Sequence, residues 1–242
     1  MKHDLSSVPM RFAYYLPVAT TWQYLLASHL SDQQSIAEWG SGWSPKIVMA
    51  LERIHYHGSF VAVDQSQDAL NYFSAFVQTL NLGLKVETLC ASFLTSIDDT
   101  YDVVILNHVF DDLLLWAYHD KAFLSYDTIY SKHDAVEKTW LEIEKHKHHH
   151  FQSLGRLLFE AFLTHTRPGG LVFLSQYASY QEKLTGGSLS VQLSVQLAKD
   201  TVQSLVESGH FLLKKETFLQ KYLTISELYF GPNDCWVLER VR

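Results

Sequence analysis

The sequence contains little that would suit a secreted or membrane-embedded protein. Cysteine is scarce: the 242 residues include only Cys90 and Cys235. A disulfide framework is therefore not expected, and both thiols are predicted to be reduced core residues. No run of about 18 apolar residues occurs, and the first residues lack the apolar stretch of a signal peptide. These absences predict no membrane span and a cytoplasmic location.

Basic residues are also in deficit. Lys and Arg total 19 while Asp and Glu total 26, which gives a formal net charge of −7. Proteins that bind nucleic acid through its phosphates usually carry a basic face, so a nucleic-acid partner is not expected and a small-molecule substrate is favoured. Apolar residues make up 47% and aromatic residues 14% of the chain. This composition can fill the core of one domain, predicted over 1–242, and line an apolar pocket.

Short apolar runs alternate with helical periodicity from residue 35 onward. This alternation is typical of βαβ units and of a parallel sheet, and therefore of an α/β fold. The predicted strands lie at 36–37, 59–64, 85–93, 101–110, 169–177, 211–219 and 235–241. The predicted helices lie at about 45–55, 67–81, 154–166 and 190–208.

Two segments fall outside this alternation. Residues 1–32 have an aromatic, helix-like pattern and are predicted to form an N-terminal helical cap. Residues 111–150 are predicted to be a helical insertion after the fourth strand, because they are too many for a connection and too few for a core of their own. This insertion holds Trp116, Tyr126 and Tyr130. We expect the cap and the insertion to close over the site as a lid.

The most informative string is SIAEWGSGWSPK. It places Glu38 at the end of an apolar strand, followed by Gly40 and Gly42 and then by a helix. Glycines let a backbone approach a ligand closely, and a neighbouring carboxylate binds an ammonium or a hydroxyl group. The crevice at the carboxyl ends of parallel strands is where such sheets bind ligands. The alternative is that the glycines only make a tight turn between strand and helix.

A second acid, Asp64, ends the next predicted strand. A carboxylate at this position can accept hydrogen bonds from both hydroxyls of a ribose. The alternative is that Asp64 caps the following helix, a role for which Ser66 competes. A dinucleotide site is less well supported, because the GxGxxG fingerprint would require a glycine where Pro45 stands.

The ExGxG string together with Asp64 resembles motif I and the second-strand acid of class I S-adenosylmethionine-dependent methyltransferases. The resemblance covers about 35–112 and resumes at RPGGLVFLSQY. It implies a Rossmann-like three-layer sandwich whose seven-stranded, mostly parallel sheet has an antiparallel strand 7. It also implies that S-adenosylmethionine is the cofactor. The residues that it places around this cofactor are Glu38, Gly40, Ser41, Gly42, Asp64, Gln65, Ser92 and Asn107. Ser92 stands where the family often has an acid that bonds the adenine amino group.

The string NHVFDDLL at the end of the fourth strand would face the methyl group in this fold. His108 is a candidate general base, since its unperturbed pKa is close to neutrality, and Asp111 is the second catalytic candidate. Asp112, Trp116 and Tyr14 are predicted to contact the substrate. The alternative is that His108 is a satisfied histidine near the core and that the acids cap the next helix. The NPPY string of enzymes that methylate amide or base amino groups is absent.

The run HKHHH at 146–150 invites a metal interpretation. Metal sites need further ligands in a defined geometry, so we predict a solvated helix face and no metal. The predicted function is methyl transfer to an oxygen or nitrogen nucleophile of a small molecule. Two alternatives remain open: a non-catalytic, cofactor-binding scaffold of the same fold, and a nicotinamide-dependent oxidoreductase.

Overall fold

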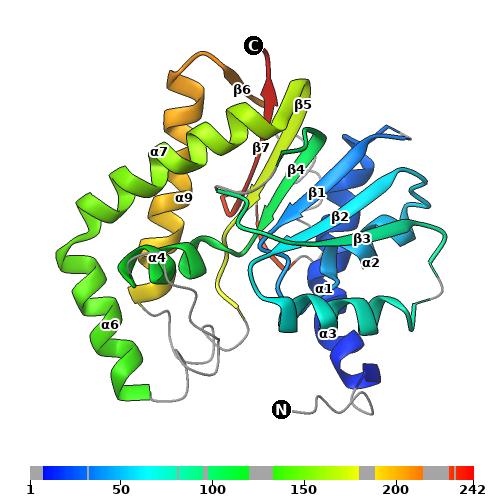
Figure 1. Ribbon diagram of the computed structural model, residues 1–242, viewed down its shortest axis with the longest axis horizontal. Coiled ribbons are helices and arrows are strands. Elements are labelled where there is room, and N and C mark those ends of the chain that lie inside the picture. The colour runs from blue at the N-terminus through cyan, green and yellow to red at the C-terminus, as the bar shows by residue number, and fades with distance from the viewer. Residues whose placement is uncertain are drawn as a thin grey trace.

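The structure is a computed structural model that describes most of the chain. The described residues are 8–31, 33–80, 82–94, 98–119, 133–179, 189–214, 229–231 and 233–242, and the side chains of 8–14 and 133–136 are not described. In Figure 1 a twisted sheet runs through the centre of the molecule, with helices against both of its faces.

The sheet has seven strands in the order β3-β2-β1-β4-β5-β7-β6. They are β1 (Ser35–Trp39), β2 (Ser59–Asp64), β3 (Lys85–Cys90), β4 (Tyr101–Asn107), β5 (Thr166–Ser175), β6 (Phe211–Lys214) and β7 (Cys235–Arg240). The first five strands pair in parallel, and β7 is antiparallel to both β5 and β6. The predicted Rossmann-like sheet with an antiparallel strand 7 is therefore confirmed. The chain changes direction across the sheet between β1 and β4, which is where such sheets form a ligand crevice.

Seven described helices form the two outer layers. One layer contains α1 (Val8–Ala27), α2 (Lys46–Arg53) and α3 (Gln67–Val77), on the right in Figure 1. The other contains α4 (Phe110–Tyr118), α6 (His133–Lys145), α7 (Lys147–His165) and α9 (Leu189–Glu207), on the left. Each layer buries its own apolar cluster against the sheet. The alternation along β4 shows this, because Val103 and Ile105 face the first layer while Val104 and Leu106 face the second.

The described part of the segment predicted as a helical insertion, 111–119 and 133–150, is largely helical. Residues 111–118 belong to α4, which follows β4 directly and packs against α7 and α9. Residues 147–150 form the first turn of α7, which begins earlier than predicted. Between them lies α6, and its Trp140 and Ile143 are buried in the apolar cluster that also holds residues of α4, α7 and α9. The predicted contributions of Tyr126 and Tyr130 lie outside the described residues.

The prediction that Cys90 is a core residue is wrong, because its side chain is exposed. The cause is the position of β3 at the edge of the sheet, where its residues are exposed or half-buried instead of continuously buried. Cys235 on β7 is buried, as expected, and both thiols are free. Within the ranges that the structure describes, no helix has the length and hydropathy needed to cross a bilayer.

Candidate functional site

The loop between β1 and α2 depends on two glycines in the left-handed region. Gly40 has φ +69°, and its N–H donates to the Val63 carbonyl at 2.8 Å. Gly42 has φ +58°, and its N–H donates to Asp64 Oδ2 at 2.9 Å. A Cβ on Gly40 would overlap Val109 Cγ2, whereas a Cβ on Gly42 would have no neighbour within 4 Å. The loop therefore packs against the β4–α4 connection on one side and faces open space at Gly42.

Asp64 joins the end of β2 to this loop. Besides Gly42, its carboxylate accepts the Ser66 N–H on Oδ1 at 2.8 Å. Ser66, not Asp64, caps α3, since its hydroxyl accepts the Ala69 N–H at 3.2 Å. Burial raises the pKa of Asp64, and the backbone N–H donors oppose that shift. The predicted alternative of Asp64 as the helix cap is therefore wrong, and its carboxylate instead ties the glycine loop to the end of β2.

Glu38 is the most unusual group in this region. Its side chain is only 1% exposed, and its Oε2 has no hydrogen-bond partner among the described residues. The pKa of Glu38 is raised to about 8, chiefly by burial. The charge of Lys46 and a hydrogen bond from Asn107 oppose this shift, and the charge of Asp64 adds to it. An unsatisfied buried carboxyl oxygen costs free energy. The position therefore suits a cationic donor that would satisfy it.

Asn107 at the end of β4 connects Glu38 to α1 and to the end of β5. Its Oδ1 accepts from Trp22 Nε1 at 3.0 Å, from Ser175 Oγ at 3.1 Å and from the Tyr177 hydroxyl at 3.0 Å. All of these side chains are buried. Asn107 was predicted from the sequence, but Trp22, Ser175 and Tyr177 were not. They come from α1 and from the end of β5, and no local spacing relates them to β4.

His108 has a left-handed backbone, with φ +57°. Its ring stacks on Tyr177 with the centroids 4.9 Å apart, and its Nδ1 lies 3.0 Å from Gln176 Nε2. The Phe110 N–H donates to Gln176 Oε1 at 3.2 Å, which turns the amide nitrogen toward the imidazole. Because an amide nitrogen only donates, Nδ1 accepts, and the neutral ring carries its proton on Nε2.

Gln176 is fully buried and holds the predicted chemical residues in place. Its Nε2 also lies 3.4 Å from Asp111 Oδ1 and 3.1 Å from Ser194 Oγ on α9. One amide thus positions His108 and Asp111 relative to the sheet. Sequence reasoning missed Gln176, although the appearance of a glutamine directly after the apolar run of β5 is a signal that could have indicated it.

The remaining predicted residues lie in several environments. Gln65 and Ser92 are brought together beyond the ends of β2 and β3, with Gln65 Nε2 3.4 Å from Ser92 Oγ. Ser41 is buried, and its hydroxyl is without a partner among the described residues. Asp112 is exposed, and Trp116 is half-buried against the α4–α7–α9 cluster. Tyr14 lies in α1, and its side chain is outside the described part of the structure.

Lys46 is a charged residue of the site that the sequence reasoning did not select. It is the first residue of α2, half-buried, and its Nζ lies 5.9 Å from the centroid of the Tyr15 ring. Burial lowers the pKa of Lys46, while the charges of Glu38, Asp111 and Asp112 raise it. Lys46 therefore lies among the acids of β1 and α4, although it follows the glycine loop in the sequence.

The histidine run lies where α6 ends and α7 begins. His146, His148 and His149 are exposed, and His150 is half-buried with its ring 6.2 Å from that of Tyr118. Burial lowers the pKa of His150, and the neighbouring His149 and His146 lower it further. No group of three or more His, Cys, Asp or Glu residues within the described ranges could hold a metal ion. The run is a largely solvated helix end.

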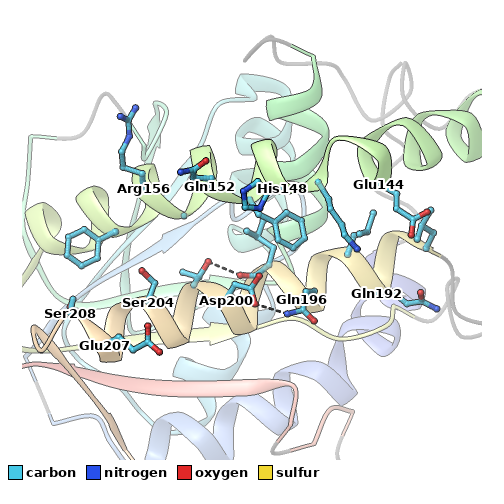
Figure 2. A pocket seen from close by; sticks show the side chains of 18 residues that line it. Glu144, His148, Gln152, Arg156, Gln192, Gln196, Asp200, Ser204, Glu207 and Ser208 are labelled. Carbon is cyan, nitrogen blue, oxygen red and sulfur yellow. Dashed lines mark hydrogen bonds between the residues drawn. The ribbon is translucent and has the colours of Figure 1, made fainter.

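An open groove of about 1060 Å³ lies between α7 and α9. Figure 2 shows side chains of both helices along its walls, including His148, Gln152 and Arg156 on one side and Gln196 and Asp200 on the other. None of the predicted site residues lines it. Its charged groups are of both signs and pair in part with neighbours on their own helix, as Asp200 does with Gln196 at 2.6 Å.

Comparisons with solved structures find the same fold in other proteins. No protein-family profile matches the sequence, and no curated protein matches it. The plantazolicin methyltransferase BpumL in complex with a monoazolic desmethylPZN analog and SAH is similar over 98% of this chain and 88% of its own, at 13% identity and a TM-score of 0.52. NSun6 from Pyrococcus horikoshii with SFG is similar over 94% of this chain and 52% of its own, at 13% identity and a TM-score of 0.54. At these identities the likeness establishes the fold: the chain has the Rossmann-like fold of these proteins.

Proposed function

We propose that the chain is an S-adenosylmethionine-dependent methyltransferase. The observation that carries this proposal is the buried Glu38, with one unpartnered oxygen, beside the Gly40–Gly42 loop at the carboxyl end of β1. Glu38 would bind the ammonium of the cofactor, Asp64 would accept from its ribose hydroxyls, and the glycine loop would let its backbone pass closely. The bound cofactor supplies an electrophilic methyl group, and the protein positions a nucleophile against it.

The similar structures support this proposal over a dinucleotide enzyme. BpumL is in complex with SAH and NSun6 with SFG. A pyrophosphate would require donors without a negative group beside the glycines, whereas Glu38 lies two residues before Gly40 and the N–H groups of this loop already donate to Val63 and Asp64. The position of Pro45 also removes the third glycine of the dinucleotide fingerprint.

We further propose that the acceptor is an oxygen or nitrogen nucleophile of a small molecule. The net charge of −7 opposes a long phosphate backbone, and the groups nearest the end of β4 include Asp111 and Asp112. BpumL, whose complex contains a desmethylPZN analog, supports this substrate class. Asp111, held by Gln176, and His108 are the groups that would touch the polar part of the acceptor.

The direct test is incubation with methyl-labelled S-adenosylmethionine and separated fractions of metabolites, RNA and protein. We expect label in the metabolite fraction. Label confined to RNA or protein would overturn the small-molecule assignment while leaving methyl transfer intact. Binding of the cofactor with no transfer to any fraction would instead favour the non-catalytic scaffold.

Replacing Asp64 should weaken cofactor binding. Asp64→Ala removes the acceptor for the ribose hydroxyls and also releases the Gly42 and Ser66 N–H groups. Loss of hydrogen bonds to a charged group costs about 1–3 kcal/mol, or roughly 5- to 150-fold in affinity for S-adenosylhomocysteine measured by calorimetry. Asp64→Asn, which keeps the shape and one acceptor oxygen, should lose less. Unchanged affinity in Asp64→Ala would remove this residue from the site.

His108 should orient the acceptor instead of deprotonating it. With Gln176 donating to Nδ1, the neutral ring presents an N–H at Nε2, which donates a hydrogen bond. His108→Asn tolerates the left-handed backbone and should lower kcat/KM about tenfold, partly through KM, as expected for one hydrogen bond. Affinity for the cofactor should not change. A loss of about a hundredfold or more in kcat with KM unchanged would identify His108 as a general base instead.

A further inference from the structure

Lys46 lies where three parts of the site meet. It begins α2 directly after the glycine loop, its charge acts on Glu38 at the end of β1 and on Asp111 and Asp112 at the start of α4, and its ammonium faces the Tyr15 ring of α1 at 5.9 Å. It is half-buried. A lysine in such a position is partly desolvated. The groups around it come from elements that are far apart in the sequence.

Lys46 makes no ion pair with any residue that the structure describes. The buried Glu38 keeps one oxygen without a hydrogen-bond partner among the same residues. Glu38 and Lys46 act on each other electrostatically, and no ion pair joins them. Glu38 thus offers a carboxyl oxygen that a cationic donor could occupy, and Lys46 offers an ammonium that makes no ion pair with a described residue. The two groups are complementary to a zwitterion whose ammonium meets Glu38 and whose carboxylate meets Lys46.

The start of α2 provides further attraction for a negative group. Its N-cap residue, Pro45, makes no side-chain hydrogen bond to the helix. The first N–H groups of a helix without a side-chain cap attract anions through the helix dipole. The ammonium of Lys46 projects from the same turn, so an anion there would meet both. Asp111 and Asp112 make this location unfavourable for an anion that lacks a cationic partner of its own.

We propose that Lys46 binds the carboxylate of the amino-acid end of the cofactor while Glu38 binds its ammonium, so that the two residues form a clamp for a zwitterion. This inference rests on the proposed function and adds a cofactor-binding residue to it. The same arrangement favours a ligand that carries both an ammonium and a carboxylate over one that carries a carboxylate alone. The reason is that Glu38, Asp111 and Asp112 attract the ammonium that accompanies the carboxylate.

The test compares two ligands that differ in one group, S-adenosylmethionine and decarboxylated S-adenosylmethionine, by calorimetry at fixed pH. The wild type should bind the first about tenfold to a hundredfold more tightly, as expected for a hydrogen bond between charged groups. Lys46→Gln should lose that preference and bind the decarboxylated ligand within about twofold of the wild type. The control Lys199→Gln, at an exposed lysine of α9, should behave as the wild type does.

A second variant keeps the test decisive if Lys46→Gln does not fold. Lys46→Arg retains the charge and should keep most of the preference for the ligand with the carboxylate. An equal loss of affinity for both ligands, or no loss for either, would overturn the clamp. So would a Lys46→Gln effect confined to the KM of the methyl acceptor, which would place Lys46 on the substrate. If the wild type binds neither ligand, the proposed function itself fails, and that outcome is distinct from the others.

Discussion

Replacing Gly40 by alanine should destabilise the protein by about 2–5 kcal/mol. The φ of +69° costs an L-residue about 1–2 kcal/mol, and the added methyl group would overlap Val109 Cγ2, which adds about 1–3 kcal/mol of overpacking. Val109 joins β4 to α4, so the strain would fall on the connection that carries His108. Urea denaturation of the ligand-free protein measures the loss.

Gly42→Ala is the matched control for this prediction. Its φ of +58° imposes a similar backbone cost, but a Cβ there meets nothing within 4 Å. We therefore expect a loss of only about 1–2 kcal/mol, together with weaker cofactor binding, because the new methyl group would enter the open space of the crevice. Equal destabilisation by the two substitutions would show that contact with Val109 does not fix the loop.

Replacing Glu38 by glutamine should stabilise the ligand-free protein near neutral pH. The pKa of Glu38 is about 8 in the folded protein, against an ordinary value of 4.5. Because the folded pKa is raised, the unfolded chain releases this proton first, and the wild type loses stability as pH rises from about 4.5 to about 8. At pH 7 the difference amounts to about 3 kcal/mol. Glu38→Gln removes this pH-dependent loss of stability. The difference in the free energy of unfolding between Glu38→Gln and the wild type, measured by urea denaturation, should therefore be near zero at pH 4 and largest above pH 8.

The same substitution should have the opposite effect on binding. An ionised Glu38 pairs with the ammonium of S-adenosylhomocysteine, whereas a glutamine cannot, so affinity should fall about tenfold or more. In the wild type, binding should release a proton from Glu38, and affinity should rise roughly tenfold per pH unit up to about pH 8. Glu38→Gln should show neither effect. A variant that is both less stable and equally able to bind would contradict the role given to this carboxyl.

The parts of the site that could be predicted from the sequence are those made by neighbouring residues. Glu38, Gly40 and Gly42 belong to one turn, and Asp64 follows a strand whose apolar run marks its end. The parallel register then brings Glu38 and Asp64 to the same edge of the sheet. Local pattern and strand order were sufficient for these residues, because each depends on only one pairing of strands.

The supporting residues could not be predicted in the same way. Trp22 and Gln176 reach the end of β4 from 85 and 66 to 68 positions away. The charge of Asp111 acts on Lys46 because α2 and α4 both start at this edge of the sheet. Such contacts follow from the packing of the two helical layers, and the spacing of residues along the chain does not predict them.

The helix at the start of the segment predicted as an insertion was not recognised from the sequence for a different reason. Asp111 and Asp112 resemble the polar start of a loop, but they lie in the first turn of α4, where acids interact favourably with the helix dipole. Leu113, Leu114 and Leu115 then bury one side of that helix. An apolar triplet directly after two acids was therefore a signal of a core helix, and the histidine-rich character of the following residues obscured it.

Titration of the wild-type protein with S-adenosylhomocysteine at pH 8, followed by calorimetry, tests the central claim most directly. At this pH about half of Glu38 is ionised, so binding does not depend on deprotonating it fully. We expect one binding site for S-adenosylhomocysteine, with a dissociation constant in the micromolar range or below. The absence of detectable binding at millimolar ligand by a folded protein would contradict this expectation.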